Sequence, residues 1–196
     1  MKERFCNILK ATGREGVDYV IEDLENWGFF KAPASGRGHG AYPGGLTEHS
    51  LNVYDAAMDL RKGLLERRPD LEPNLSEESV AIAALLHDVC KAKGYRLVHK
   101  KRKNSLGMYE DCDEYEYNDD WMPVGHGEKS VILLLPSIDL TDDEIMAIRW
   151  HMGPWNLGKD EEKAYRMATR QSALQTLIHA ADTVASALYE RDAPKL

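Results

Sequence analysis

Apolar residues recur at intervals of three and four along most of this chain, which is the spacing of one face of an α-helix. This pattern predicts helices over residues 5–11, 17–27, 48–66, 77–88, 126–135, 142–151 and 169–190. Thr47, Ser76 and Thr141 stand where the hydroxyl of an N-cap residue would accept a hydrogen bond from the first helical turn. The helix over 77–88 is apolar on most sides, so we expect it to lie at the centre of the core.

The character of the sequence changes between residues 95 and 117. Here residues 95–100 and 108–117 predict two β-strands joined by a turn. Residues 100–103 are basic and residues 110–114 are mostly acidic, so charge pairing between the strands accounts for both runs. The predicted fold class is therefore all-α, a helical bundle with a small β-hairpin insertion around residues 95–117.

Length and composition indicate an ordinary globular domain. The chain has 196 residues, which suits one domain with a substantial hydrophobic core. Hydrophobic residues make up 43% and charged residues 30%, values that are typical of globular proteins. We expect a single domain over residues 1–196, with its core at 39–190 and the helices of residues 1–30 packed on it.

Charge and cysteine content argue against several classes of protein. The net charge of −8 does not suit a chain that coats nucleic acid, and the short basic run at 100–103 is weak support for nucleic-acid binding. No apolar run approaches the roughly 18–20 residues that span a bilayer, and residues 1–6 hold no apolar signal-peptide core. Three scattered cysteines without a CxxC motif are typical of a reducing compartment. These features predict a cytoplasmic location and no membrane partner.

An apolar run at residues 84–86 leads directly into His87 and Asp88, and Lys91 follows about one turn later. A buried carboxylate needs a counter-charge, and a buried imidazole needs a partner. A bound metal ion meets both needs, because neutral histidine and carboxylate are common metal ligands. This motif predicts a metal site if other parts of the chain supply further ligands.

Other histidines and one aspartate lie at the ends or on the apolar faces of the predicted helices. Each histidine alone is more typical of an ordinary core residue. With the first motif they make six candidate metal ligands: His49, His87, Asp88, His126, His151 and Asp182. A mixture of histidine and carboxylate without cysteine favours Mn, Fe, Co, Ni, Zn or Mg over a structural zinc site. Six ligands with Asp88 as a bridge would fit two metals about 3.5–4 Å apart.

A loop rich in Gly, Pro and Ala at residues 31–45 can bring backbone N–H groups close to an anion. The loop contains Arg37 and His39, which are candidate contacts for a phosphate. A solvated connection with one incidental histidine explains the loop equally well, so both interpretations stay open.

The motifs, in this order, resemble those of the HD superfamily of metal-dependent phosphohydrolases. In sequence, residues 41–50 (AYPGGLTEHS) and 86–91 (LHDVCK) most resemble HD proteins of the 3′–5′ exoribonuclease branch. Residues 125–128 (GHGE) and 150–153 (WHMG) are similar to the two extra histidine segments of the dinuclear branch.

The resemblance implies an all-helical core that holds one or two divalent metals, with Mn, Fe, Ni, Co or Mg as candidates. It implies four ligands for the first metal: His49, His87, Asp88 and Asp182. It also implies that Asp88 bridges to a second metal, which is held by His126 and His151.

The implied activity is hydrolysis of a phosphoester by metal-activated water, with a nucleotide or a similar small phosphorylated molecule as substrate. Asp88 and Lys91 would be the catalytic residues, and the Lys91 ammonium would also bind a phosphate oxygen as a point charge. Gly40 and Met152 stand where relatives often have a second histidine. The nucleic-acid-binding OB domain of the exoribonuclease branch has no counterpart here.

Two other functional classes share the same ligand set. One is a di-iron oxygenase, since oxygenases of the myo-inositol oxygenase type resemble this arrangement. The other is a metal-stabilised binding module without turnover. The sequence predicts neither the metal nor the oligomeric state.

Overall fold

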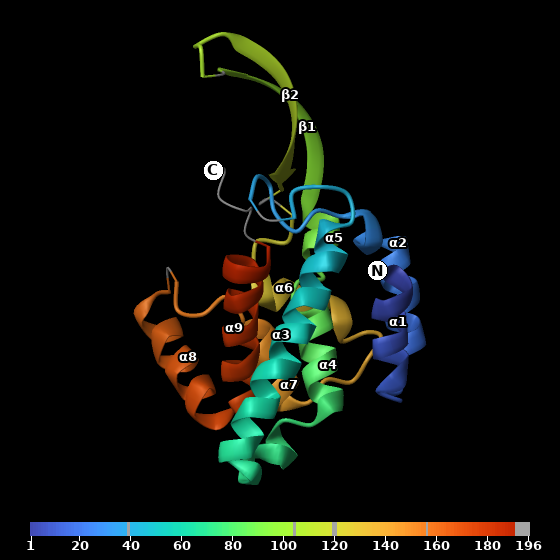
Figure 1. The fold of residues 1–196 in the computed structure, drawn as a ribbon, viewed down its shortest axis with the longest axis vertical. Helices are drawn as coiled ribbons and strands as arrows, with labels where there is room; N and C mark the ends of the chain where they lie inside the picture. Colours follow the sequence, from blue (N-terminus) through green and yellow to red (C-terminus); the bar gives the residue numbers. More distant parts are fainter. Residues whose placement is uncertain (39, 104, 119–120, 156, 191–196) are drawn as a thin grey trace.

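The computed structural model describes residues 1–38, 40–103, 105–118, 121–155 and 157–190. Its body is a bundle of helices, and a β-hairpin projects from one end of the bundle (Figure 1). Four helices pack in a closed ring: α3 (Gly45–Arg67), α4 (Glu77–Leu86), α7 (Asp142–Arg149) and α9 (Ala173–Val184). In this ring α3 contacts α4 and α9, and α7 contacts the same two helices. The predicted all-α class is confirmed.

Other elements surround this ring. Helices α1 (Lys2–Ala11) and α2 (Val17–Asn26) bury apolar side chains in the common core. Helix α6 (His126–Leu134) packs on α7, and α8 (Lys159–Gln171) packs on α9. The remaining helical elements are short: η1 (Phe29–Lys31), η2 (Pro69–Asn74), α5 (Lys91–Gly94) and the π-helical turn η3 (Ala185–Tyr189). Of the helices in the described part of the chain, none is both long and apolar enough to cross a membrane.

Helix α4 lies at the centre of the core, as its apolar sequence predicts. All side chains from Val80 to Leu86 are buried. Two of the predicted N-caps are confirmed, because the hydroxyls of Ser76 and Thr141 accept hydrogen bonds from backbone N–H groups at 3.1 and 3.2 Å.

The end of α4 differs from the prediction by two residues. The helix ends at Leu86, and His87 and Asp88 lie in a tight turn beyond it. In this turn the N–H groups of Val89 and Lys91 bond to the carbonyl groups of Leu86 and Asp88, three residues back. Such i→i+3 bonds tighten the last turn of a helix, so a helical sequence pattern continues past the true end.

The predicted N-cap of α3 is wrong. The helix begins at Gly45 after Gly44, whose φ of 87° is in the left-handed region. Thr47 is instead buried in the first turn. A Cβ atom on Gly45 would lie 2.1 Å from the carbonyl oxygen of Gly40, so the loop passes too close for any side chain there. The glycines therefore set the start of this helix.

The predicted helix over 169–190 is two helices in the structure. Helix α8 ends at Gln171, and Ser172 caps α9 by accepting a hydrogen bond from the N–H of Gln175 at 3.2 Å. Most of α8 escapes the sequence prediction because this helix contains few apolar residues and buries only Ala168.

The predicted hairpin is confirmed as strands β1 (Tyr95–Lys103) and β2 (Tyr109–Tyr117), which pair antiparallel along their whole length. The expected charge pairing is present, for example between Lys100 Nζ and Glu116 Oε1 at 3.0 Å. The hairpin continues from α5, so its base lies close to the turn that follows α4 (Figure 1).

Replacing a core residue of α4 should cost far more stability than replacing an exposed residue of the hairpin. Ile82 is completely buried, so Ile82→Ala should lower the free energy of unfolding by about 2–5 kcal/mol. Leu97 is 60% exposed, so Leu97→Ala should change it by less than about 0.5 kcal/mol. Urea unfolding followed by circular dichroism measures both values, and equal losses would contradict the assigned core.

Candidate metal centre

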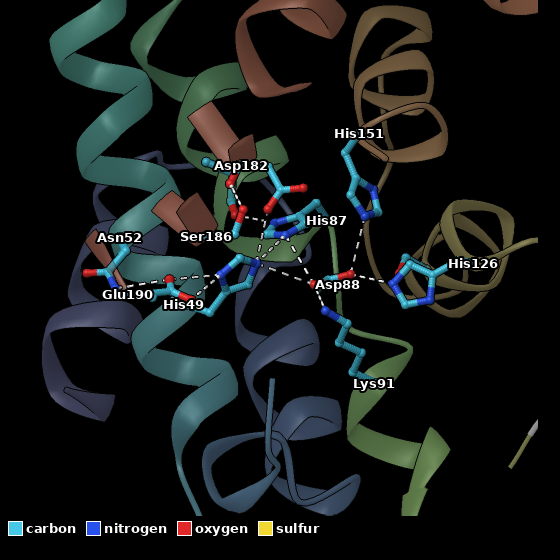
Figure 2. Close-up of polar contacts among 12 residues, drawn as sticks. His49, Asn52, His87, Asp88, Lys91, His126, His151, Asp182, Ser186 and Glu190 are labelled. Atoms are coloured by element: carbon cyan, nitrogen blue, oxygen red, sulfur yellow. Dashed lines mark hydrogen bonds and ion pairs between the residues drawn. The ribbon is translucent and has the colours of Figure 1, made fainter. Parts of the chain in front are cut away.

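The structure brings together all six residues that the sequence marks as candidate metal ligands (Figure 2). They come from the ends of five helices: His49 from the first turns of α3, His87 and Asp88 from the turn after α4, His126 from the start of α6, His151 from the end of α7 and Asp182 from α9. Two of them, His126 and Asp182, are partly exposed, and the other four are buried.

Three donor groups meet between α3, α4 and α9. The Nε2 atom of His49 lies 3.3 Å from Asp182 Oδ1 and 3.2 Å from His87 Nε2. One ligand atom from each of these three residues lies within 4.8 Å of the other two. The spacing could hold one metal ion among them.

Asp88 lies at the centre of the remaining donors. Its Oδ1 atom is 2.5 Å from His126 Nε2 and 3.3 Å from His151 Nε2. Its Oδ2 atom is 3.3 Å from His87 Nε2 and 2.6 Å from Lys91 Nζ. A second group that could hold a metal consists of His87, Asp88 and His151, so His87 belongs to both groups.

Backbone carbonyl groups fix the ring orientation of two of these histidines. His87 Nδ1 lies 2.8 Å from the carbonyl oxygen of Ala84, and His151 Nδ1 lies 2.7 Å from that of Ile148. A carbonyl oxygen can only accept, so each Nδ1 carries the hydrogen and each Nε2 directs a lone pair into the site.

These lone pairs need a cation. The Nε2 atoms of His49 and His87 face each other at 3.2 Å, a distance at which two lone pairs would repel unless a proton or metal lies between them. His151 Nε2 is buried and makes no hydrogen bond to any described residue. A buried nitrogen of this kind is costly unless something binds it, so the donor set fits a metal ion.

The pKa shifts of the clustered residues also favour a bound cation. Burial alone would raise the pKa of Asp88, but the Lys91 ammonium and neighbouring imidazoles outweigh burial and hold that pKa well below its ordinary value. Burial also opposes ionisation of Asp182, yet the hydrogen bond from His49 and nearby imidazoles lower its pKa. Burial would lower the pKa of His49, but hydrogen bonds to Asp182 and two other carboxylates raise it well above the ordinary value. A metal bound at Nε2 of His49 would replace the proton on that nitrogen.

The model of the HD domain family matches residues 46–187, which is most of the chain. This chain belongs to the HD domain family. HD domains bind divalent metals, and the family consists mostly of metal-dependent phosphohydrolases. The matched stretch contains all six candidate ligands. Comparisons with curated proteins and with solved structures gave no match.

Lys91 lies at the edge of the HD-domain cluster, with 13% of its side chain exposed. Burial would lower the pKa of Lys91, but the adjacent Asp88 carboxylate outweighs burial and raises it. The side chain is therefore a fixed positive charge beside the candidate ligands, where the sequence predicts a phosphate contact.

Two residues of the glycine-rich loop, Arg37 and His39, are predicted to contact a phosphate, and the structure describes only the first. Arg37 pairs with Glu114 of β2, with Nη2 at 3.0 Å and Nε at 3.2 Å from Oε2. Its side chain is 63% exposed. A phosphate contact by Arg37 stays a prediction. His39 lies outside the described residues.

Some contacts of the cluster escape the sequence prediction. Glu190 lies beside a candidate ligand, yet its place near the end of the chain gives no signal for this role. Cys90 is buried, and its Sγ atom is 3.4 Å from His126 Nδ1. His179 Nδ1 donates to the carbonyl oxygen of His151 at 2.7 Å. Helical spacing identifies apolar faces but not which distant residues meet there.

Removing one donor should weaken metal binding, while removing an exposed histidine should not. We expect His151→Asn to raise the dissociation constant for Mn²⁺ at least about tenfold, because His151 supplies a buried nitrogen that makes no hydrogen bond to any described residue. His99 lies on the hairpin with 66% of its side chain exposed, so His99→Asn should stay within twofold of wild type, roughly the scatter of surface substitutions. Isothermal titration calorimetry measures both, and equal affinities would exclude His151 as a ligand.

Proposed function

We propose that this chain is a metal-dependent phosphohydrolase that cleaves the phosphoester of a nucleotide or a similar small phosphorylated molecule. The observation that carries this proposal is the position of Lys91. Its ammonium group lies 2.6 Å from Asp88 Oδ2, at the edge of a cluster of imidazoles whose lone pairs need a cation. A fixed positive charge beside a metal site suits a phosphoryl group better than an uncharged substrate.

Six residues would hold the metal or metals: His49, His87, Asp88 and Asp182 on one side, and His126 and His151 with Asp88 on the other. Divalent Mn, Fe, Ni, Co and Mg are the candidates, because the donors are imidazole nitrogens and carboxylate oxygens. When bound, such ions lower the pKa of water and polarise phosphoryl oxygens.

The protein's own residues position the substrate. The Lys91 ammonium would bind a non-bridging phosphoryl oxygen, and Asp88 keeps this ammonium directed into the site. Arg37 would take a distal phosphate by exchanging its present anion, the Glu114 carboxylate, for another. His39 is the other candidate for this contact.

Phosphate release tests the proposal. Purified protein receives Mn²⁺, Ni²⁺, Co²⁺ or Mg²⁺ in turn, with a panel of nucleotides, an aryl phosphate and an aryl phosphodiester. We expect metal-dependent release that is abolished by a chelator and by Asp88→Ala. Lys91→Ala should lower kcat by about 10²–10³-fold, because it removes a charge that contacts the reacting group. Circular dichroism shows whether each variant is folded.

Lys93→Ala is the matched control. Lys93 lies two residues further along, with Nζ over the rings of Trp27 and Trp121 at 5.6 Å from each centroid. Its loss should leave kcat within about twofold, as for a substitution away from the site. No release with any metal, or full activity of Asp88→Ala, would contradict the proposal. Oxygen uptake by the iron-loaded protein would then favour the di-iron oxygenase.

A further inference from the structure

A buried carboxylate outside the predicted ligand set contacts one of the candidate ligands. The Oε1 and Oε2 atoms of Glu190 lie 2.9 and 3.2 Å from His49 Nδ1, on the side of the ring away from the other donors (Figure 2). Only 7% of the Glu190 side chain is exposed. Asn52 Nδ2 donates to Glu190 Oε1 at 3.1 Å, so the carboxylate is held from a second direction.

A change of helix type brings Glu190 to this position. Beyond α9 the chain forms the π-helical turn η3, in which the N–H of Glu190 bonds to the carbonyl of Ala185, five residues back, at 3.0 Å. This turn contains one residue more than an α-helical turn, so it sets the following residue back by about 100° around the axis. In a continuous α-helix Tyr189, seven residues after Asp182, would share its face. The extra residue gives that position to Glu190.

Asp182 and Glu190 consequently contact opposite nitrogens of one imidazole. Asp182 Oδ1 lies 3.3 Å from His49 Nε2, while the Glu190 carboxylate lies against Nδ1. The rings of His87 and His151 are held by backbone carbonyls three residues back on their own segments. His49 is held by a charged group from the other end of the chain.

We infer that Glu190 is a positioning residue for His49, an inference that rests on the proposed metal-dependent function. The carboxylate accepts the Nδ1–H hydrogen and leaves Nε2 to donate its lone pair to a metal. It also makes the imidazole a stronger donor, as carboxylates behind metal-bound histidines do. Glu190 thus raises the affinity of the subsite formed by His49, His87 and Asp182, without touching metal or substrate.

Zinc binding tests this role, with Glu190→Gln, Glu190→Ala and a charge-matched control. We expect Glu190→Gln to raise the dissociation constant for Zn²⁺ by about 10–100-fold, and Glu190→Ala by more, because alanine offers no acceptor. Glu48→Gln removes the same charge from the residue preceding His49, where Glu48 binds the Tyr42 hydroxyl instead. Its affinity should stay within about twofold of wild type.

Nitrogen-15 NMR of the zinc-loaded proteins separates positioning from a general structural role. In the wild type, His49 should show a protonated Nδ1 and a metal-bound Nε2. In Glu190→Ala the Nδ1 proton loses its acceptor and should exchange rapidly with solvent, while the His87 signals stay unchanged. Far-UV circular dichroism checks that the variants are folded.

The outcomes separate the two claims. Wild-type binding with unchanged affinity and tautomer in both Glu190 variants would overturn the positioning role and leave the proposed function standing. If Glu48→Gln lost as much affinity as Glu190→Gln, the change in net charge alone would explain the loss. That result would also overturn the positioning role. A wild-type protein that takes up no divalent metal would overturn both claims.

Discussion

The structure depends on the burial of one ionised carboxylate, that of Asp88, among imidazole rings. Removing a carboxylate from water costs several kcal/mol unless opposite charges and hydrogen bonds surround it. Lys91 and His126 contact its two oxygens at 2.6 and 2.5 Å and offset part of this cost. The helices of the ring start or end at this point, so each brings a polar residue to one place while its apolar face stays in the core. The cluster still contains nitrogen lone pairs that face each other, and a divalent cation would resolve that conflict.

The way in which the donors are held indicates how such a cation would bind. The backbone carbonyls of Ala84 and Ile148 fix two imidazoles through hydrogen bonds within a single turn, so these rings need little reorganisation. His49 lies within α3, and its Nδ1–H donates to the carboxylate of Glu190, the last described residue of the chain. Two imidazoles are therefore oriented by hydrogen bonds within their own turn. The orientation of His49 depends instead on a contact between segments that lie far apart in the sequence. Lys91 adds a positive charge at the edge of the site, and the proposed function assigns this charge to a phosphoryl group of the substrate.

The sequence predicts most of the polar cluster because several of its members interrupt an apolar pattern. His87 and Asp88 follow a fully apolar helix, and Asp182 lies beside an apolar stripe. Other features depend on contacts that no local pattern records. Gly40 and Gly45, rather than Thr47, determine where α3 begins, because two stretches of backbone pass at close range. The π-helical turn that brings Glu190 to His49 has no periodic signature, since it shifts the helix by a single residue.

The most direct test of a metal centre in this cluster is anomalous diffraction from crystals grown with Zn²⁺. We expect an anomalous peak about 2.0–2.1 Å from the Nε2 atoms of His49 and His87, with Asp182 at a similar distance. A second peak between Asp88, His126 and His151 would identify a dinuclear site. Absence of any peak among these side chains at saturating zinc, with their arrangement unchanged, would contradict the central claim.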